Sequence, residues 1–228
     1  MALTYLKKNK PRYSDSVMLL HGLGRTHFSM LKMESALKHE GYRVINLSYP
    51  SRKKNIAQLA DEIISRGVEE SQQHQANTIH FVTHSMGGIL LRDYLSKHKI
   101  EHLGHTVMLS PPNKGSELVD RLRNNFFFKW ILGPAGSELG TDPSSTPKKL
   151  NKVDFPVGII TGNKNTVFDG YFANMITGEN DGKISVESAR VNGMVDFLVT
   201  ANNHTLIMND AKVIKQTIHF LRKGRFKR

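Results

Sequence analysis

The sequence contains no cysteine. This absence excludes disulfide bonds, a cysteine nucleophile and thiolate metal sites, although it is compatible with either redox compartment. Long apolar runs are also absent: no stretch reaches the roughly 18 residues of a transmembrane helix. Acidic residues are fewer than basic ones, with 20 Asp and Glu against 32 Lys and Arg, so the formal net charge is +12.

Several motifs of cofactor and metal chemistry are missing as well. The stretch "HGLGRTHF" (21–28) lacks the third glycine and the following acidic residue of a dinucleotide fingerprint, and there is no glycine-rich phosphate loop with its lysine. No HExxH pattern occurs, and His98, His102 and His105 have only Glu101 as a nearby carboxylate. We therefore expect no metal and no cofactor.

The basic residues gather in three separate clusters, at 7–12, 51–54 and 222–228. None of the clusters is interleaved with the aromatic residues that stack on bases, so we expect no nucleic-acid partner. A weak association with anionic membrane surfaces remains open. The first residues, "MALTYLKKNK", lack the apolar segment of a secretory signal, which predicts a cytoplasmic protein, although a chain trimmed at its N-terminus would look the same.

With 228 residues, the length suits one domain, and short apolar runs alternate with segments of helical periodicity. This alternation predicts an α/β fold with a mostly parallel central sheet flanked by helices. The expected strands are 16–22, 42–49, 78–85, 105–112, 155–163 and 194–201, and the expected helices are 29–40, 56–73, 88–97 and 210–222.

Two long interruptions break this rhythm, at 113–154 and 164–193. Unstructured loops of this length are uncommon in a compact domain unless they carry function, so we interpret both as inserts over one end of the sheet. The first insert contains Phe126, Phe127 and Trp130. It is either a short cap that supplies an apolar acyl-binding wall or a helical excursion that simply packs on the domain.

Ser85 lies in "FVTHSMGG", directly after the third expected strand and before a helical segment. A strand, a sharp turn and a helix push a serine hydroxyl out at the carboxyl edge of a parallel sheet, where open α/β sheets bind their ligands. Gly87 and Gly88 allow close packing of strand and helix. Thr83 departs from the glycine usual two residues before such a nucleophile, so a serine that merely starts a helix stays an alternative.

The loop "HGLG" follows the first expected strand and includes His21, Gly22 and Gly24. Acyl transfer needs two backbone N–H groups that point at the developing oxyanion, and glycines let a loop turn its amides inward. The candidate donors are the N–H groups of Leu23 and Met86, because Met86 starts the helix after Ser85. A plain glycine turn is the alternative.

Taken together, "HGLG", "THSMGG", "SPPNKGSEL" (110–118), "NDGKISVESA" (180–189) and "NNHTLIM" (202–208) resemble the α/β-hydrolase family, and within it the compact bacterial lipases and esterases. The resemblance extends from about residue 16 to about residue 220 and implies the α/β-hydrolase fold. The family's order of nucleophile, acid and histidine implies Ser85, Asp181 and His204, with Asp181 in the second insert.

Other residues compete for the two partner roles. The rival acids are Asp154, Asp169, Glu179 and Asp196. Asp154 and Asp196 belong to the wrong end of the sheet, and Asp169 is the plausible alternative, because it follows the fifth expected strand closely. Among the other histidines, His84 is adjacent to Ser85 but is expected to point in a different direction. His27, His80 and His105 lie near strand ends or helix starts and are expected to have packing roles.

We expect a serine esterase or lipase that forms an acyl-enzyme from a small ester with an apolar acyl group. There are two alternatives. One is a thioesterase or amidase that uses the same residues, and the other is a non-catalytic basic protein that binds membrane surfaces with this scaffold.

Overall fold

The computed structural model describes residues 15–165 and 173–228. In these residues six parallel strands form one sheet in the order β2-β1-β3-β4-β5-β6. The strands are β1 (Asp15–Leu20), β2 (Arg43–Leu47), β3 (Thr78–His84), β4 (Leu103–Leu109), β5 (Val157–Gly162) and β6 (Asp196–Thr200). The predicted α/β architecture with a parallel sheet is confirmed, and each expected apolar run contains one strand or most of one.

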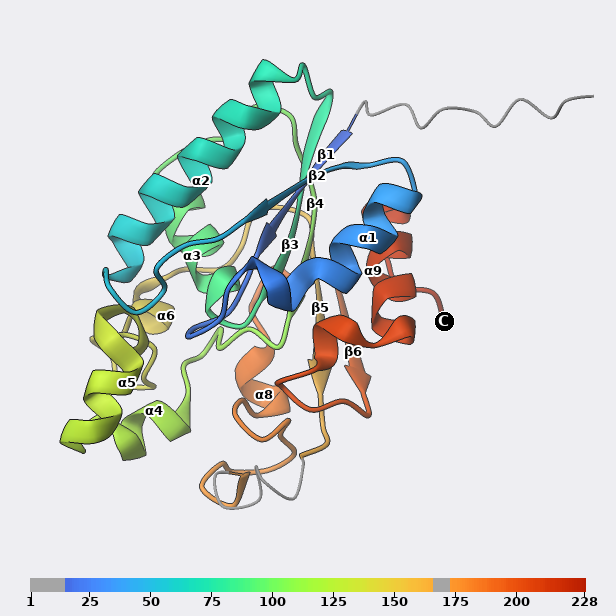
Figure 1. The fold of residues 1–228 in the computed structure, drawn as a ribbon. Coiled ribbons are helices and arrows are strands. Elements are labelled where there is room, and N and C mark those ends of the chain that lie inside the picture. The colour runs from blue at the N-terminus through green and yellow to red at the C-terminus, as the bar shows by residue number, and fades with distance from the viewer. Residues whose placement is uncertain (1–14, 166–172) are drawn as a thin grey trace, which may run out of the picture.

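Helices cover both faces of this sheet (Figure 1). The helices α1 (Leu31–His39) and α9 (Ala211–Lys223) lie on one face, and α2 (Ile56–Gln73) and α3 (Met86–Leu95) lie on the other. Strand β1 shows why both faces are apolar: Val17 and Leu19 join the core under α1 and α9, whereas Met18 and Leu20 join the core under α2 and α3. A strand that is buried on both faces reads as a continuous apolar run.

Local signals define the helix ends. Asn55 caps α2 by accepting a hydrogen bond from the Gln58 N–H, and the Gln58 side chain bonds back to the Asn55 N–H. Asp210 accepts hydrogen bonds from the first amides of α9, which ends at Gly224 in a left-handed conformation.

The two inserts have structure of their own. The first contains α4 (Glu117–Leu122), α5 (Phe126–Ser137) and α6 (Thr146–Lys149), and α5 is kinked at Gly133, which is followed by Pro134. The described part of the second contains α8 (Val186–Ala189). Short 3-10 helices, η1 (His27–Met30) and η3 (Ile207–Asn209), follow β1 and β6. In Figure 1, α4, α5 and α8 lie beyond the carboxyl edge of the sheet.

Candidate active site

Ser85 stands alone between β3 and α3, with a φ of 52° and a ψ of −122°. This conformation is strained for a residue with a side chain, and such strain is concentrated at functional sites. The Ser85 side chain makes no capping hydrogen bond to α3, so the interpretation of Ser85 as a helix-capping serine is wrong. The helix begins at Met86, two residues earlier than the sequence predicted.

Gly87 allows the turn to form. A Cβ atom at Gly87 would lie 2.7 Å from the carbonyl oxygen of Leu20 at the end of β1. Gly88 explains how Thr83 fits where a glycine was expected, because a Cβ atom at Gly88 would lie 3.2 Å from Oγ1 of Thr83. The hydroxyl of Thr83 therefore uses space that the second glycine leaves.

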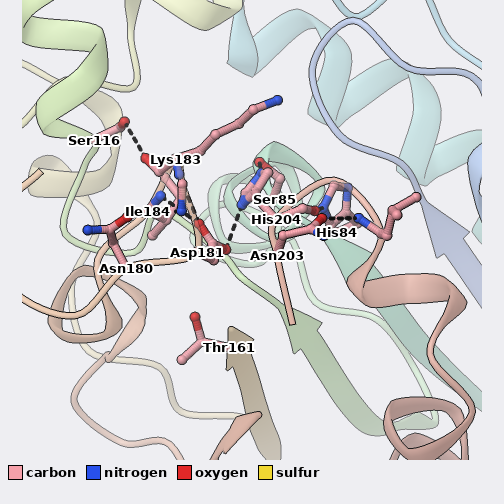
Figure 2. A network of polar contacts seen from close by, with 12 residues as sticks. His84, Ser85, Ser116, Thr161, Asn180, Asp181, Lys183, Ile184, Asn203 and His204 are labelled. Carbon is pink, nitrogen blue, oxygen red and sulfur yellow. Dashed lines mark hydrogen bonds and ion pairs between the residues drawn. The ribbon is translucent and has the colours of Figure 1, made fainter. Parts of the chain in front are cut away.

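His204 connects Ser85 to Asp181 (Figure 2). Nε2 of His204 lies 3.0 Å from Oγ of Ser85, and Nδ1 lies 2.8 Å from Oδ2 of Asp181. The side chains of His204 and Asp181 are 6% and 0% exposed. The three residues come from β3–α3, the second insert and the loop after β6, so the structure brings together the residues that the family order implied.

Asp181 is held by the turn that its own sequence forms. Its Oδ1 accepts hydrogen bonds from the N–H groups of Lys183 (3.1 Å) and Ile184 (2.8 Å), and its backbone carbonyl accepts one from the His204 N–H (2.9 Å). Burial acts to raise the pKa of Asp181, but the facing His204 and the amide of Ile184 outweigh it and hold the pKa below its usual range. Asp181 is thus a carboxylate at neutral pH.

Three of the competing acids, Asp154, Asp196 and Glu179, do not contact His204 in the described structure. Asp154 borders a different pocket and Asp196 begins β6, at the opposite edge of the sheet, as the sequence predicted. Glu179 is exposed. Asp169 lies outside the described residues.

His84 has a positioning contact that the sequence analysis did not foresee. Its Nε2 lies 3.0 Å from the backbone carbonyl oxygen of His204, and because a carbonyl only accepts, Nε2 carries the hydrogen. Burial, more than any other cause, holds the pKa of His84 well below its ordinary value. A neutral imidazole therefore fixes the backbone of His204. A strand-end histidine gives no sequence signal for such a contact.

The loop after β1 is held rigidly against Ser85. His21 stacks on Tyr49 with ring centroids 3.8 Å apart, and its Nδ1 bonds the Gly22 carbonyl at 2.9 Å. The Tyr49 hydroxyl donates to the His21 carbonyl. A Cβ atom at Gly22 would lie 2.8 Å from Nδ1 of His84, and Gly24, with a φ of 67°, donates its N–H to Oγ of Ser51. The glycines thus bring this loop close to the serine.

The N–H groups of Leu23 and Met86 donate no hydrogen bond to another group in the described part of the chain. Leu23 lines the same pocket as Ser85, and Met86 is the first residue of α3. Both amides are therefore available to a ligand beside Ser85.

A pocket of about 370 Å³ opens beside Ser85 and His204. Its apolar wall comes mainly from the first insert and includes Leu118, Val119, Leu122, Ile131, Leu132 and Leu139. Phe126 and Trp130 are not among the described lining residues and are 89% and 73% exposed, which corrects the residues expected for the acyl-binding wall. The backbone of Phe127 belongs to α5, but its side chain lies outside what the structure describes.

Within residues 15–165 and 173–228, no group of three His, Asp or Glu side chains is arranged to hold a metal ion. None of the helices in these residues has both the length and the apolar character needed to cross a membrane.

No protein-family model and no curated protein sequence matches this chain. Solved structures do. The mature form of the lipase BlEst2 from Bacillus licheniformis has a TM-score of 0.75 and 21% identity, covering 94% of this chain and 94% of that chain. The esterase PF2001 from Pyrococcus furiosus has a TM-score of 0.66 and 17% identity, covering 93% of this chain and 83% of its own.

The metagenomic carboxyl esterase MGS0156 has a TM-score of 0.65 and 15% identity, covering 85% of this chain and 65% of its own. At these identities the likeness concerns the fold. The chain has the α/β-hydrolase fold, and the resemblance stated from its motifs is confirmed at that level.

Proposed function

We propose that this protein is a serine hydrolase that cleaves carboxylic esters. One observation carries the proposal: Ser85, His204 and Asp181 form a continuous chain of contacts of 3.0 Å and 2.8 Å at the mouth of an apolar pocket. The assignment of an ester, in preference to other acyl compounds, is supported by neighbours that are named as a lipase and esterases.

In the proposed reaction, Nε2 of His204 takes the proton of Ser85 while Oγ attacks the ester carbonyl carbon. Asp181 accepts the Nδ1 hydrogen, which fixes the tautomer of His204 and stabilises the imidazolium. The bond to the alcohol then breaks and His204 protonates the leaving oxygen, so an acyl-enzyme remains on Ser85. Water, deprotonated by His204, releases the carboxylic acid and regenerates the serine.

The N–H groups of Leu23 and Met86 would stabilise the oxyanion. Met86 follows Ser85 in the chain, and Leu23 lines the same pocket as Ser85. Met86 also begins α3, so the positive end of the helix dipole lies at its N–H group. Loss of one such donor costs about 3 kcal/mol of transition-state stabilisation. The contacts that hold His21 and Gly22 would keep the Leu23 amide in place before the substrate arrives.

Two alternatives follow from the same site. A thioesterase or amidase would use identical residues, and only the leaving group would differ. A non-catalytic basic protein bound to membrane surfaces is less well supported, because such a protein has no need of a buried carboxylate, an imidazole and a strained serine in hydrogen-bond contact.

Labelling with a fluorophosphonate probe tests the proposal. The wild type and Ser96→Ala, which removes an exposed hydroxyl at the far end of α3, should be labelled and should hydrolyse a 4-nitrophenyl ester. Ser85→Ala should do neither while its circular dichroism spectrum stays the same. Labelling of the Ser85→Ala variant, or full esterase activity in it, would refute the assignment.

A further inference from the structure

The buried ring of His21 is held in one orientation and in one tautomer. It stacks on Tyr49 with an angle of 11° between the two ring planes, and its Nε2 lies 3.3 Å from the backbone nitrogen of Tyr49. A backbone N–H only donates, so Nε2 accepts and carries no hydrogen. Burial lowers the pKa of His21 to about 4, so the ring is neutral near neutral pH and its hydrogen is on Nδ1.

The hydrogen on Nδ1 is donated to the backbone carbonyl of Gly22, at 2.9 Å. Because a carbonyl only accepts, this contact requires the same tautomer of His21 as the contact with Tyr49. The Arg25 N–H donates to the same carbonyl at 3.2 Å and closes a turn from Gly22 to Arg25. Two donors therefore set the direction of the Gly22 carbonyl.

The carbonyl of Gly22 belongs to the same peptide unit as the N–H of Leu23. A peptide unit is planar, and this one is trans, so its carbonyl and its N–H point in opposite directions. Fixing the carbonyl therefore fixes the direction of the Leu23 N–H, which donates to no group in the described part of the chain. A hydrogen bond to the carbonyl oxygen also polarises the unit and makes its N–H a stronger donor.

The surroundings of Leu23 restrict this peptide unit further. The next N–H along the chain, that of Gly24, donates to Oγ of Ser51 at 2.9 Å. Helix α5 packs against the Leu23 side chain, because a Cβ atom at Gly136 would lie 2.7 Å from Cδ2 of Leu23. The Leu23 N–H thus keeps one direction before any ligand arrives.

We infer, on the basis of the proposed function, that His21 is a positioning residue for the oxyanion. Its neutral ring donates from Nδ1 to the Gly22 carbonyl and thereby aims and strengthens the Leu23 N–H. That N–H stabilises the negative oxygen that forms when Oγ of Ser85 attacks the ester. His21 neither takes nor gives a proton in the reaction. Because full negative charge develops only after the attack, His21 lowers the barrier without tightening the binding of the substrate.

His21→Asn and His21→Gln test the inference as a pair. The amide nitrogen of Asn can occupy the position of Nδ1, whereas the amide of Gln extends to the position of Nε2. His21→Gln should therefore lower kcat on a 4-nitrophenyl ester by about 10-fold to 100-fold with little change in KM. Its affinity for an alkyl trifluoromethyl ketone, which adds to Ser85 as an oxyanion, should fall by a similar factor. His21→Asn should keep most of both kcat and this affinity.

His80→Gln is the matched control. His80 is also buried and its Nδ1 also bonds a backbone N–H, but it lies toward the end of β3 that is remote from Ser85. This variant should lose stability, yet it should keep the wild-type kcat and KM.

A measurement on the wild type is independent of how the variants fold. Proton–nitrogen correlation spectra identify the tautomer of His21, which should carry its hydrogen on Nδ1. The resonance of this hydrogen should move downfield when the trifluoromethyl ketone adds to Ser85, because an oxyanion at the Leu23 N–H makes the Gly22 carbonyl a stronger acceptor.

Three results would overturn the inference while leaving the esterase intact. They are a hydrogen on Nε2 of His21, a resonance that the ketone does not move, and equal kcat values for His21→Asn and His21→Gln. A wild type that hydrolyses no ester and reacts with neither the ketone nor the fluorophosphonate would instead overturn the proposed function, and this inference with it.

Discussion

Two buried histidines beneath the candidate active site should make the stability of this protein fall as the pH is lowered. His21 and His84 are 0% and 1% exposed. Burial, as the main cause, lowers the pKa of His21 from 6.5 to about 4 and puts the pKa of His84 well below 6.5. In the unfolded chain both imidazoles return to an ordinary pKa.

The sign follows from the proton count. Because the folded-state pKa values lie below the unfolded ones, the unfolded chain binds more protons below pH 6.5. The stabilisation is complete above that pH and is lost as the pH falls. For His21, a change from about pH 7 to about pH 5 should cost about 2 kcal/mol of unfolding free energy. His84 contributes with the same sign and at most about 2 kcal/mol at that pH. His80, whose pKa burial also lowers, adds to the trend.

Urea denaturation followed by far-UV circular dichroism at the two pH values measures this difference. His21→Gln and His84→Gln each remove a buried ring and its contacts, so each variant should be less stable than the wild type at neutral pH. Because each variant also lacks one titrating group, it should lose less stability on acidification. The reduction should be about 2 kcal/mol for His21→Gln. His74→Gln, which changes an exposed histidine after α2, should show the wild-type difference.

The reasoning is refuted if both His21→Gln and His84→Gln lose as much unfolding free energy between the two pH values as the wild type loses. That result would mean that the two imidazoles take up protons in the folded protein as readily as in the unfolded chain.

Two further predictions concern the acid and the surface. Asp181→Asn should lower kcat on a 4-nitrophenyl ester by about 10³-fold to 10⁴-fold, because an amide cannot hold the imidazole tautomer or stabilise the imidazolium. Asp169→Asn should leave kcat unchanged. The reverse result would assign the role of the acid to Asp169. The basic surface should bind anionic vesicles at low ionic strength, and the exposed Phe126 and Trp130 should add to that binding. A Phe126→Ser, Trp130→Ser double variant should therefore need more lipid to sediment with the vesicles than the wild type needs. Equal binding by the variant and the wild type would contradict a role for these aromatics.

Much of the fold could be predicted from the sequence because the four inner strands, β1, β3, β4 and β5, are buried along most of their length on both faces. A buried parallel strand shows as an unbroken apolar run, and all six runs were visible without structure. Ser85 was equally visible, because a strand, a serine and two glycines leave few conformations for the turn. The pairing of Asp181 with His204 was implied by family order alone, since 23 positions separate them.

What could not be predicted depends on which way a side chain points. Phe126 and Trp130 made the first insert look like an apolar wall, yet Ile131 and Leu132 of the same helix line the pocket. A run of aromatic residues in the sequence indicates that a helix is apolar. The kink at Gly133 and the packing of α5 decide which face of the helix lies toward the pocket.

Two hydrogen bonds hold the backbone of His204 in place beside Ser85. Its N–H donates to the carbonyl of Asp181 at 2.9 Å, and its carbonyl accepts from His84 at 3.0 Å, so both backbone groups are fixed by residues of the site itself. An imidazole on such a backbone has little freedom left to lose when it bonds Ser85, and preorganisation of this kind lowers the entropy cost of reaching the transition state. His84 donates this hydrogen bond only while its Nε2 carries a hydrogen. Nε2 carries one both in the neutral Nε2–H tautomer and in the imidazolium. Charging His84 would therefore weaken the site through the cost of a buried cation next to His204, and not through loss of that hydrogen bond.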